Sequence, residues 1–129
     1  MPELAEVEYF RKRWDPGLGS RIDRVLTNPK ARIYRDIPAV AVQRGLGGRK
    51  LLGSATHGKQ MLFEFSDGAW LGLHLGMTGK LVFDTPVYEP VKSDHLVLET
   101  ADGKLVFSDY RMFGKLTLDL TDHGGPPRW

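Results

Sequence analysis

The sequence predicts a mainly β domain with helices, built as a two-layer antiparallel β-sandwich flanked by an N-terminal α-helix and a short second helix. From Lys50 onward the chain consists of short apolar runs of alternating polarity, as expected of strands that bury one face. The Asp-Gly pairs Asp67-Gly68 and Asp102-Gly103 separate neighbouring runs, and this dipeptide is a strong hairpin signal. The two segments with helical character precede these runs, and the helices are expected to flank the sandwich.

The first element expected is a helix over residues 3–14. Val7, Phe10 and Trp14 recur at helical spacing and form its apolar side. Basic residues 11–13 lie near its end, where cations suit the helix dipole, and Asp15-Pro16-Gly17 ends it. Two further elements precede Lys50: a strand at 22–26 and the short second helix at 38–46.

Alternation is clearest in two consecutive strands. Met61, Phe63 and Phe65 share one face of the first strand. The residues 71, 73 and 75, all leucine, repeat the pattern in the second strand and send His74 to the opposite face. The remaining strands are expected at 80–83, 95–99, 104–107 and 115–120.

Length and composition indicate a single domain. A chain of 129 residues can bury one core but not two. Residues 1–120 are expected to form the domain, and 121–129 a linker or tail towards a further domain, because Gly124-Gly125-Pro126-Pro127 extends neither a strand nor a helix. The absence of cysteine excludes a disulfide framework and a cysteine zinc site in this sequence. No apolar run approaches the roughly 18 residues of a membrane span and no signal-peptide pattern is present, so a cytoplasmic, nucleoid-associated location without a membrane partner is expected.

The net charge of +2 conceals an uneven distribution. Residues 11–59 contain twelve Lys or Arg and three Asp, a net charge of +9, so the remaining residues sum to 2 − 9 = −7. Such a cationic segment suits a polyanion, because phosphate neutralisation is the main sequence-independent source of DNA affinity. The alternative is that these charges are scattered over solvated faces.

The chain start carries a possible nucleophile. Once Met1 is removed, which a small second residue normally permits, Pro2 becomes a secondary amine with the Glu3 carboxylate beside it. An α-amino group titrates at about 7.7–8.0, so it can act as a nucleophile near neutral pH. Its attack on an aldehyde-level carbon gives an iminium, which serves as an electron sink. The alternative is that Pro2 only permits methionine removal and that the nearby glutamates lie at the start of a helix without a catalytic role.

Four segments in a fixed order add to this reading of Pro2. They are Pro2-Glu3-Leu4-Ala5-Glu6-Val7-Glu8, His57-Gly58-Lys59-Gln60, His74-Leu75-Gly76-Met77-Thr78-Gly79 and Asp109-Tyr110-Arg111-Met112-Phe113-Gly114. Together they resemble the motifs of the formamidopyrimidine-DNA glycosylase and endonuclease VIII family of base-excision repair enzymes. The resemblance extends from Pro2 to about Leu120 and is closer to the formamidopyrimidine branch.

The resemblance implies a bifunctional DNA glycosylase/AP lyase. Pro2 would attack C1′ of a flipped-out oxidised purine nucleotide, and β- then δ-elimination would cut the strand. Glu3 corresponds to the catalytic acid at the sugar-ring oxygen, and Glu6 to a supporting glutamate one helical turn away. Lys59 corresponds to the catalytic lysine that holds a phosphate beside the lesion.

The remaining matched residues imply contacts with DNA. His74 corresponds to a phosphate-binding histidine. Met77, Arg111 and Phe113 correspond to the three residues that fill the gap left by the extruded base. The implied partner is damaged double-stranded DNA bound by a monomer. No cofactor or metal is implied within this chain, since the family's four-cysteine zinc finger belongs to a C-terminal half.

Two substitutions depart from the family pattern. Ala5 stands where proline is commonest, and Met112 replaces a second basic residue beside Arg111. Without the C-terminal half, excision by this domain is expected to be weak or absent. Two other classes stay open: a non-catalytic nucleic-acid-binding module that retains the fold, and a β-sandwich whose partner is a protein.

Overall fold

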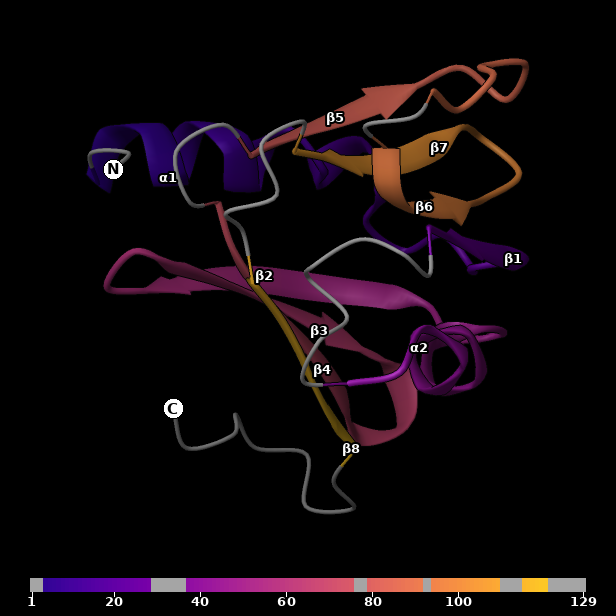
Figure 1. Cartoon of the computed structure of the whole chain (residues 1–129), viewed down its shortest axis with the longest axis horizontal. Helices are drawn as coiled ribbons and strands as arrows, with labels where there is room; N and C mark the ends of the chain where they lie inside the picture. Colours follow the sequence, from indigo (N-terminus) through magenta and orange to yellow (C-terminus); the bar gives the residue numbers. More distant parts are fainter. Residues whose placement is uncertain (1–3, 29–36, 76–78, 92–93, 110–114, 121–129) are drawn as a thin grey trace.

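The structure, a computed structural model, describes residues 4–28, 37–75, 79–91, 94–109 and 115–120. In this part of the chain two four-stranded antiparallel sheets pack face to face (Figure 1). The first sheet has the order β1 (Arg24–Thr27), β6 (Asp94–Glu99), β7 (Lys104–Ser108) and β5 (Lys80–Asp84). The second has the order β2 (Leu51–His57), β3 (Gln60–Phe65), β4 (Ala69–His74) and β8 (Lys115–Leu120). The predicted fold class is therefore confirmed.

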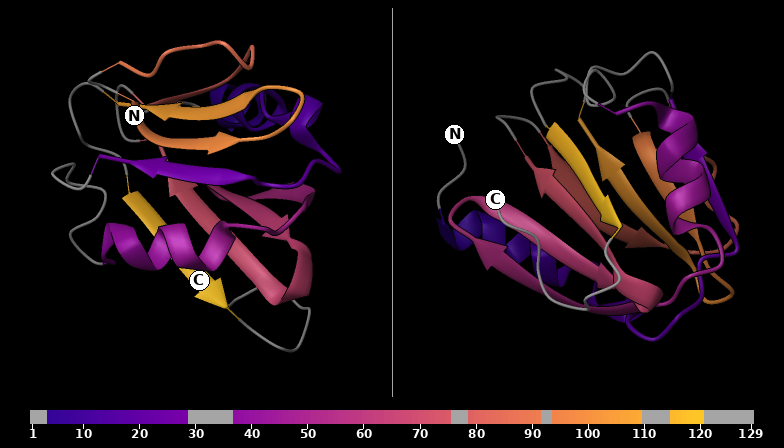
Figure 2. Two further views of the ribbon diagram at one scale, coloured as in Figure 1. Left: turned by 90° about the vertical axis from the view of Figure 1, so that its right-hand side faces the viewer. Right: turned by 90° about the horizontal axis from the view of Figure 1, so that it is seen from below.

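Each open edge of the sandwich carries a helix. Helix α1 (Leu4–Lys12) lies against β2 and β5, whereas α2 (Ala39–Leu46) lies against β1 and β8. Figure 2 shows the two helices on opposite sides of the sheets. The helix predicted at 38–46 is confirmed with Pro38 as its N-cap residue, and the predicted stop of the first helix is a 3₁₀ turn, η1 (Asp15–Gly17).

The predicted strand at 22–26 begins later than expected. Ile22 is buried, but its backbone pairs with the segment after α2: its N–H donates to the Arg49 carbonyl, and its own carbonyl accepts from Gly48. The Asp23 N–H donates to the Glu99 carbonyl of β6, and the strand register with β6 runs from Arg24. Burial of Ile22 thus reflects the α2–β2 connection, which a local apolar pattern does not distinguish from a strand.

The core lies between the sheets and contains the predicted alternating residues. Met61, Phe63 and Phe65 are each no more than 1% exposed, as are the leucines at 71, 73 and 75. Trp14, just beyond α1, closes the core beside Phe63, with the two ring centroids 4.7 Å apart. Its indole N–H donates to the Val106 carbonyl at 3.3 Å, which satisfies the polar atom of a buried ring.

Both predicted Asp-Gly hairpins are present, and each requires its glycine for a different reason. Asp67 and Gly68 connect β3 to β4 (through the 3₁₀ turn η3, Ser66–Gly68) with φ values of 63° and 83°, the left-handed region that glycine tolerates. Gly103, between β6 and β7, is needed for close approach instead. A Cβ at Gly103 would lie 2.4 Å from the carbonyl oxygen of Asp84.

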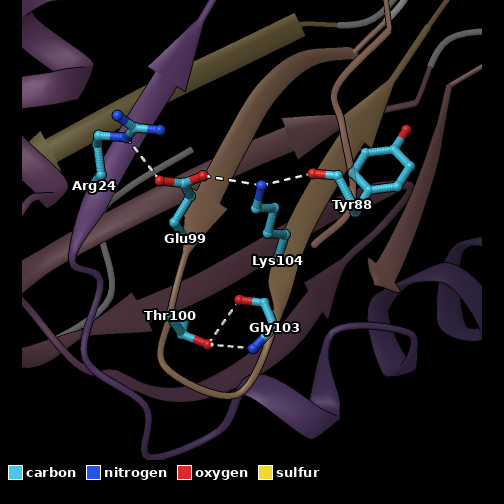
Figure 3. Close-up of polar contacts among 6 residues, drawn as sticks. All are labelled: Arg24, Tyr88, Glu99, Thr100, Gly103 and Lys104. Atoms are coloured by element: carbon cyan, nitrogen blue, oxygen red, sulfur yellow. Dashed lines mark hydrogen bonds and ion pairs between the residues drawn. The ribbon is translucent and has the colours of Figure 1, made fainter. Parts of the chain in front are cut away.

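A polar network on the first sheet fastens the loop that follows β5 (Figure 3). The Glu99 carboxylate accepts from Arg24 Nε at 2.7 Å and pairs with Lys104 Nζ at 3.1 Å. Lys104 Nζ also donates to the Tyr88 carbonyl at 2.6 Å. The hydrogen bond from Arg24, followed by that from Lys104, holds the pKa of Glu99 below its ordinary value. Burial, together with a hydrogen bond to Asp94, raises the pKa of Tyr88 to about 12.

Candidate functional site

One end of the sandwich collects the described parts of all four sequence motifs. Strand β2 ends at His57 and β3 begins at Gln60, so the turn containing Lys59 lies at this end. Strand β4 also ends here, because His74 pairs with Gln60. Ser108, the last residue of β7, pairs with Lys80 at the start of β5. Strand β8 begins at this end as well, because Lys115 pairs with His74.

Helix α1 points its first turn towards the same end. The Arg11 guanidinium donates from Nη1 to Ser54 Oγ at 2.9 Å, and, after Arg11, the Thr56 side chain lowers the pKa of the Glu8 carboxyl. Going backwards along α1 therefore corresponds to going forwards along β2. Leu4, about 6 Å further along the axis from Glu8, lies towards the β2–β3 turn. Figure 1 shows the start of α1 and this hairpin on the same side of the molecule.

The β2–β3 turn presents Lys59 beside a polar row. Gly58 has a φ of 61°, which permits a two-residue connection, and Lys59 is half-buried. His57 pairs with Gln60, and Gln60 pairs with His74 on the next strand. These three residues lie on the sheet face opposite the core, because Met61 and Leu73 face inward. The row therefore places two imidazoles and an amide next to one another at this end.

The predicted site residues fall into two groups. The structure brings Lys59 and His74 to the same end of the sandwich, and it leaves Glu6 exposed on the first turn of α1. The other predicted residues lie outside the described ranges: Pro2, Glu3, Met77, Arg111 and Phe113. The predicted tail at 121–129 also lies outside them.

The predicted roles omit residues that the structure places at this end. His57 and Gln60 share the row with His74, which follows from counting outward from the Gly58-Lys59 turn. Glu8 and Arg11 join α1 to β2, and their helical spacing of three residues predicts their ion pair. The contact of Arg11 with Ser54 spans 43 residues, so no local pattern in the sequence predicts it.

The cationic segment 11–59 does not form a single face in the described part of the chain. Lys50 and Lys59 flank β2 at its two ends. Arg49 is directed to backbone carbonyls, with hydrogen bonds to Gly45 and Ser66 of 2.6 and 2.8 Å. The described residues thus favour the alternative of scattered charges, and the case for an anionic ligand depends on the Lys59 end alone.

A family model of the formamidopyrimidine-DNA glycosylase N-terminal domain matches residues 1–116. The chain belongs to this family. Among its curated relatives, the formamidopyrimidine-DNA glycosylase of Geobacter metallireducens is 44% identical over 117 residues, which are 88% of this chain and 42% of that protein. The formamidopyrimidine-DNA glycosylase of Burkholderia thailandensis is 38% identical over 128 residues, which are 96% of this chain and 45% of that protein.

Solved structures of the family share the fold. A complex between the Lactococcus lactis Fpg and DNA containing an abasic site superimposes with a TM-score of 0.82 at 32% identity, covering 94% of this chain and 44% of that chain. A complex of the same protein with DNA containing FAPY-dG gives a TM-score of 0.79 at 32% identity, covering 93% of this chain and 45% of that chain. The present chain thus spans less than half the length of the family members that it matches.

Within the described ranges, no group of three or more His, Cys, Asp or Glu is arranged to hold a metal ion. None of the described helices is long and apolar enough to cross a membrane.

Proposed function

We propose that this chain is the N-terminal catalytic part of a bifunctional DNA glycosylase/AP lyase that acts on damaged double-stranded DNA. The proposal rests on one observation: Lys59, His74 and the start of α1 lie at the same end of the sandwich. Membership of the formamidopyrimidine-DNA glycosylase family supports it, as does the fold shared with a relative solved in complex with DNA containing an abasic site.

The proposed reaction starts at Pro2, two residues ahead of the first described residue of α1. Its secondary amine, once deprotonated, forms a bond to C1′ of the flipped-out nucleotide, and the bond from C1′ to the base breaks with its electron pair leaving on the base. Glu3 supplies a proton to the ring oxygen as the sugar opens, and proton transfer of this kind is typically worth 10²–10⁴ in rate. The resulting iminium accepts electrons during the elimination steps.

Strand cleavage then follows from the electron sink. Loss of a proton from C2′ lets the bond between C3′ and its phosphate oxygen break, which is β-elimination. A second elimination breaks the bond between C5′ and its phosphate oxygen. In the proposal, Lys59 holds a phosphate beside the lesion and His74 a second one, since both lie at the end towards which the first turn of α1 points. Met77, Arg111 and Phe113 fill the space left by the extruded base.

The proposal assigns oxidised purines as substrates, and a monomer acting in the cytoplasm on nucleoid DNA. Since the chain spans less than half of its relatives, we expect weak DNA binding and little excision of an intact damaged base. Schiff-base formation at a preformed abasic site requires less of the base pocket. It is therefore the step to measure.

Borohydride trapping on a duplex with one abasic site tests the proposal. Removal of Met1 is first verified by intact mass. The wild-type chain is expected to form a covalent adduct that is lost in Pro2→Gly and in a chain with one extra residue before Pro2, because an amide nitrogen is not nucleophilic. Glu3→Gln and Lys59→Ala are expected to slow its formation, while Lys50→Ala, at the opposite end of β2, leaves it unchanged.

The alternative function gives a different result in the same experiment. A nucleic-acid-binding module would bind the duplex in a salt-sensitive way without any adduct. A β-sandwich with a protein partner would show no affinity for DNA even at low salt. Either result contradicts the proposed activity.

A further inference from the structure

We propose that the Glu8–Arg11 pair is a positioning device, which fixes α1 along β2 and so sets the separation between the N-terminal amine and Lys59. The inference rests on the proposed function. The two groups lie on separate elements, Pro2 ahead of α1 and Lys59 after β2. Their separation therefore depends on how the helix is placed along the strand.

The contacts are suited to this task. Arg11 donates to Glu8 from two nitrogens, Nε at 3.2 Å to Oε1 and Nη2 at 2.7 Å to Oε2. Its third nitrogen, Nη1, donates to Ser54 Oγ at 2.9 Å and to the Ser54 carbonyl at 3.4 Å. The planar guanidinium thus joins a helix residue and a strand residue at once, with the fixed geometry that a lysine does not provide.

A second residue of β2 acts on the same ion pair. After Arg11, the Thr56 side chain lowers the pKa of the Glu8 carboxyl, and Thr56 lies two residues beyond Ser54 on the same face of β2. Sliding α1 by one residue, about 1.5 Å, would lengthen the 2.9 Å hydrogen bond between Arg11 and Ser54. Arg11 has a side-chain exposure of 17%, compared with 66% for Arg24 in the ion pair with Glu99. The Arg11 side chain is therefore better shielded from water than that of Arg24, whereas its partner Glu8 is 42% exposed.

The path from the pair to the reacting atoms is short. Pro2 is two residues ahead of Leu4, the first residue of α1. Lys59 follows Thr56 by three residues through the turn at Gly58. A displacement of about 1 Å between reacting groups can cost 10²-fold in rate. The positioning role should consequently appear in the rate of Schiff-base formation more than in affinity for DNA.

Single-turnover borohydride trapping at saturating abasic-site duplex tests the inference, with the dissociation constant measured in parallel. Arg11→Ala is expected to lower the trapping rate 10- to 100-fold and to change the dissociation constant less than 3-fold. Arg11→Lys is expected to restore only part of the rate. Arg24→Ala is the matched control, since it removes a 2.7 Å arginine–glutamate pair on the other sheet and should leave the rate unchanged.

Ser54→Ala provides a second variant that leaves the helix sequence intact, in case Arg11→Ala unfolds. It is expected to slow trapping without loss of the circular dichroism spectrum of the folded chain. Trapping by Arg11→Ala or Ser54→Ala at the wild-type rate, or an equal loss in Arg24→Ala, overturns the inference alone. Absence of an adduct in the wild-type chain overturns the proposed function instead, so the two failures are distinct.

Discussion

Replacement of Lys59 by alanine should reduce the salt dependence of DNA binding, because the proposed site places this ammonium group on a phosphate. Each phosphate neutralised contributes about 0.9 to the slope of log K against log salt on duplex DNA. When the salt concentration rises fourfold, from 50 to 200 mM, each phosphate contact lowers the affinity about 3.5-fold. The loss of affinity over this range should therefore be about 3.5-fold smaller for Lys59→Ala than for the wild-type chain. The absolute affinity should fall most at the lowest salt concentration.

Lys50 offers the matched control on the same strand. It is exposed and precedes the seven-residue strand β2, whereas Lys59 follows it. At about 3.3 Å per residue the two side chains are separated by roughly 23 Å, which exceeds the Debye length of about 10 Å at 0.1 M salt. Lys50→Ala should leave the slope unchanged.

Fluorescence anisotropy of a labelled duplex containing an abasic-site analogue measures both slopes. The reasoning predicts a slope smaller by about 0.9 for Lys59→Ala and equal to wild type for Lys50→Ala. If the two variants change the slope equally, binding depends on overall charge and the proposed end of the sandwich is wrong.

Three further predictions concern stability, measured by urea or thermal unfolding followed by circular dichroism. Phe63→Ala should lower the free energy of unfolding by about 3–5 kcal/mol, because its ring is fully buried, and a loss below 1 kcal/mol would contradict the assigned core. Gly103→Ala should destabilise by about 1–3 kcal/mol, since its Cβ would lie 2.4 Å from a carbonyl oxygen, while Gly53→Ala, with no atom within 4 Å, should be close to neutral. The pKa values of Glu8 and Glu99 are lowered in the folded state. These carboxylates therefore stabilise the fold above the ordinary pKa of 4.5, and this stabilisation is lost as the pH falls through the lowered values. Glu99→Gln should consequently make the free energy of unfolding depend less steeply on pH in acid.

The sandwich could be predicted from the sequence because local patterns identify its strands. Alternation in 61–65 and 71–75 fixed the buried faces, and the Asp67-Gly68 pair fixed the turn between them. Strand order is a different matter. The pairing of β1 with β6 and of β4 with β8 joins residues far apart in the chain, and no local pattern carries that information.

The site was predictable where a motif coincided with a turn or a strand end. Lys59 follows a glycine in a hairpin, and the leucines beside His74 defined its face, so the positions of both follow from local patterns. The alignment of α1 along β2 was not predictable, because the contact between Arg11 and Ser54 exists only once the fold is formed. Charge counting also misses that the Arg49 guanidinium is directed to the backbone carbonyls of Gly45 and Ser66, because these contacts exist only once the fold is formed.

The most direct test of the central claim is the identity of the residue that becomes bonded to DNA. The borohydride-trapped adduct is digested with protease and nuclease, and the modified peptide is sequenced by tandem mass spectrometry. The account predicts that the sugar remnant is carried by the nitrogen of Pro2, in a peptide that starts without Met1. A remnant on the side chain of Lys59 or another lysine would contradict it.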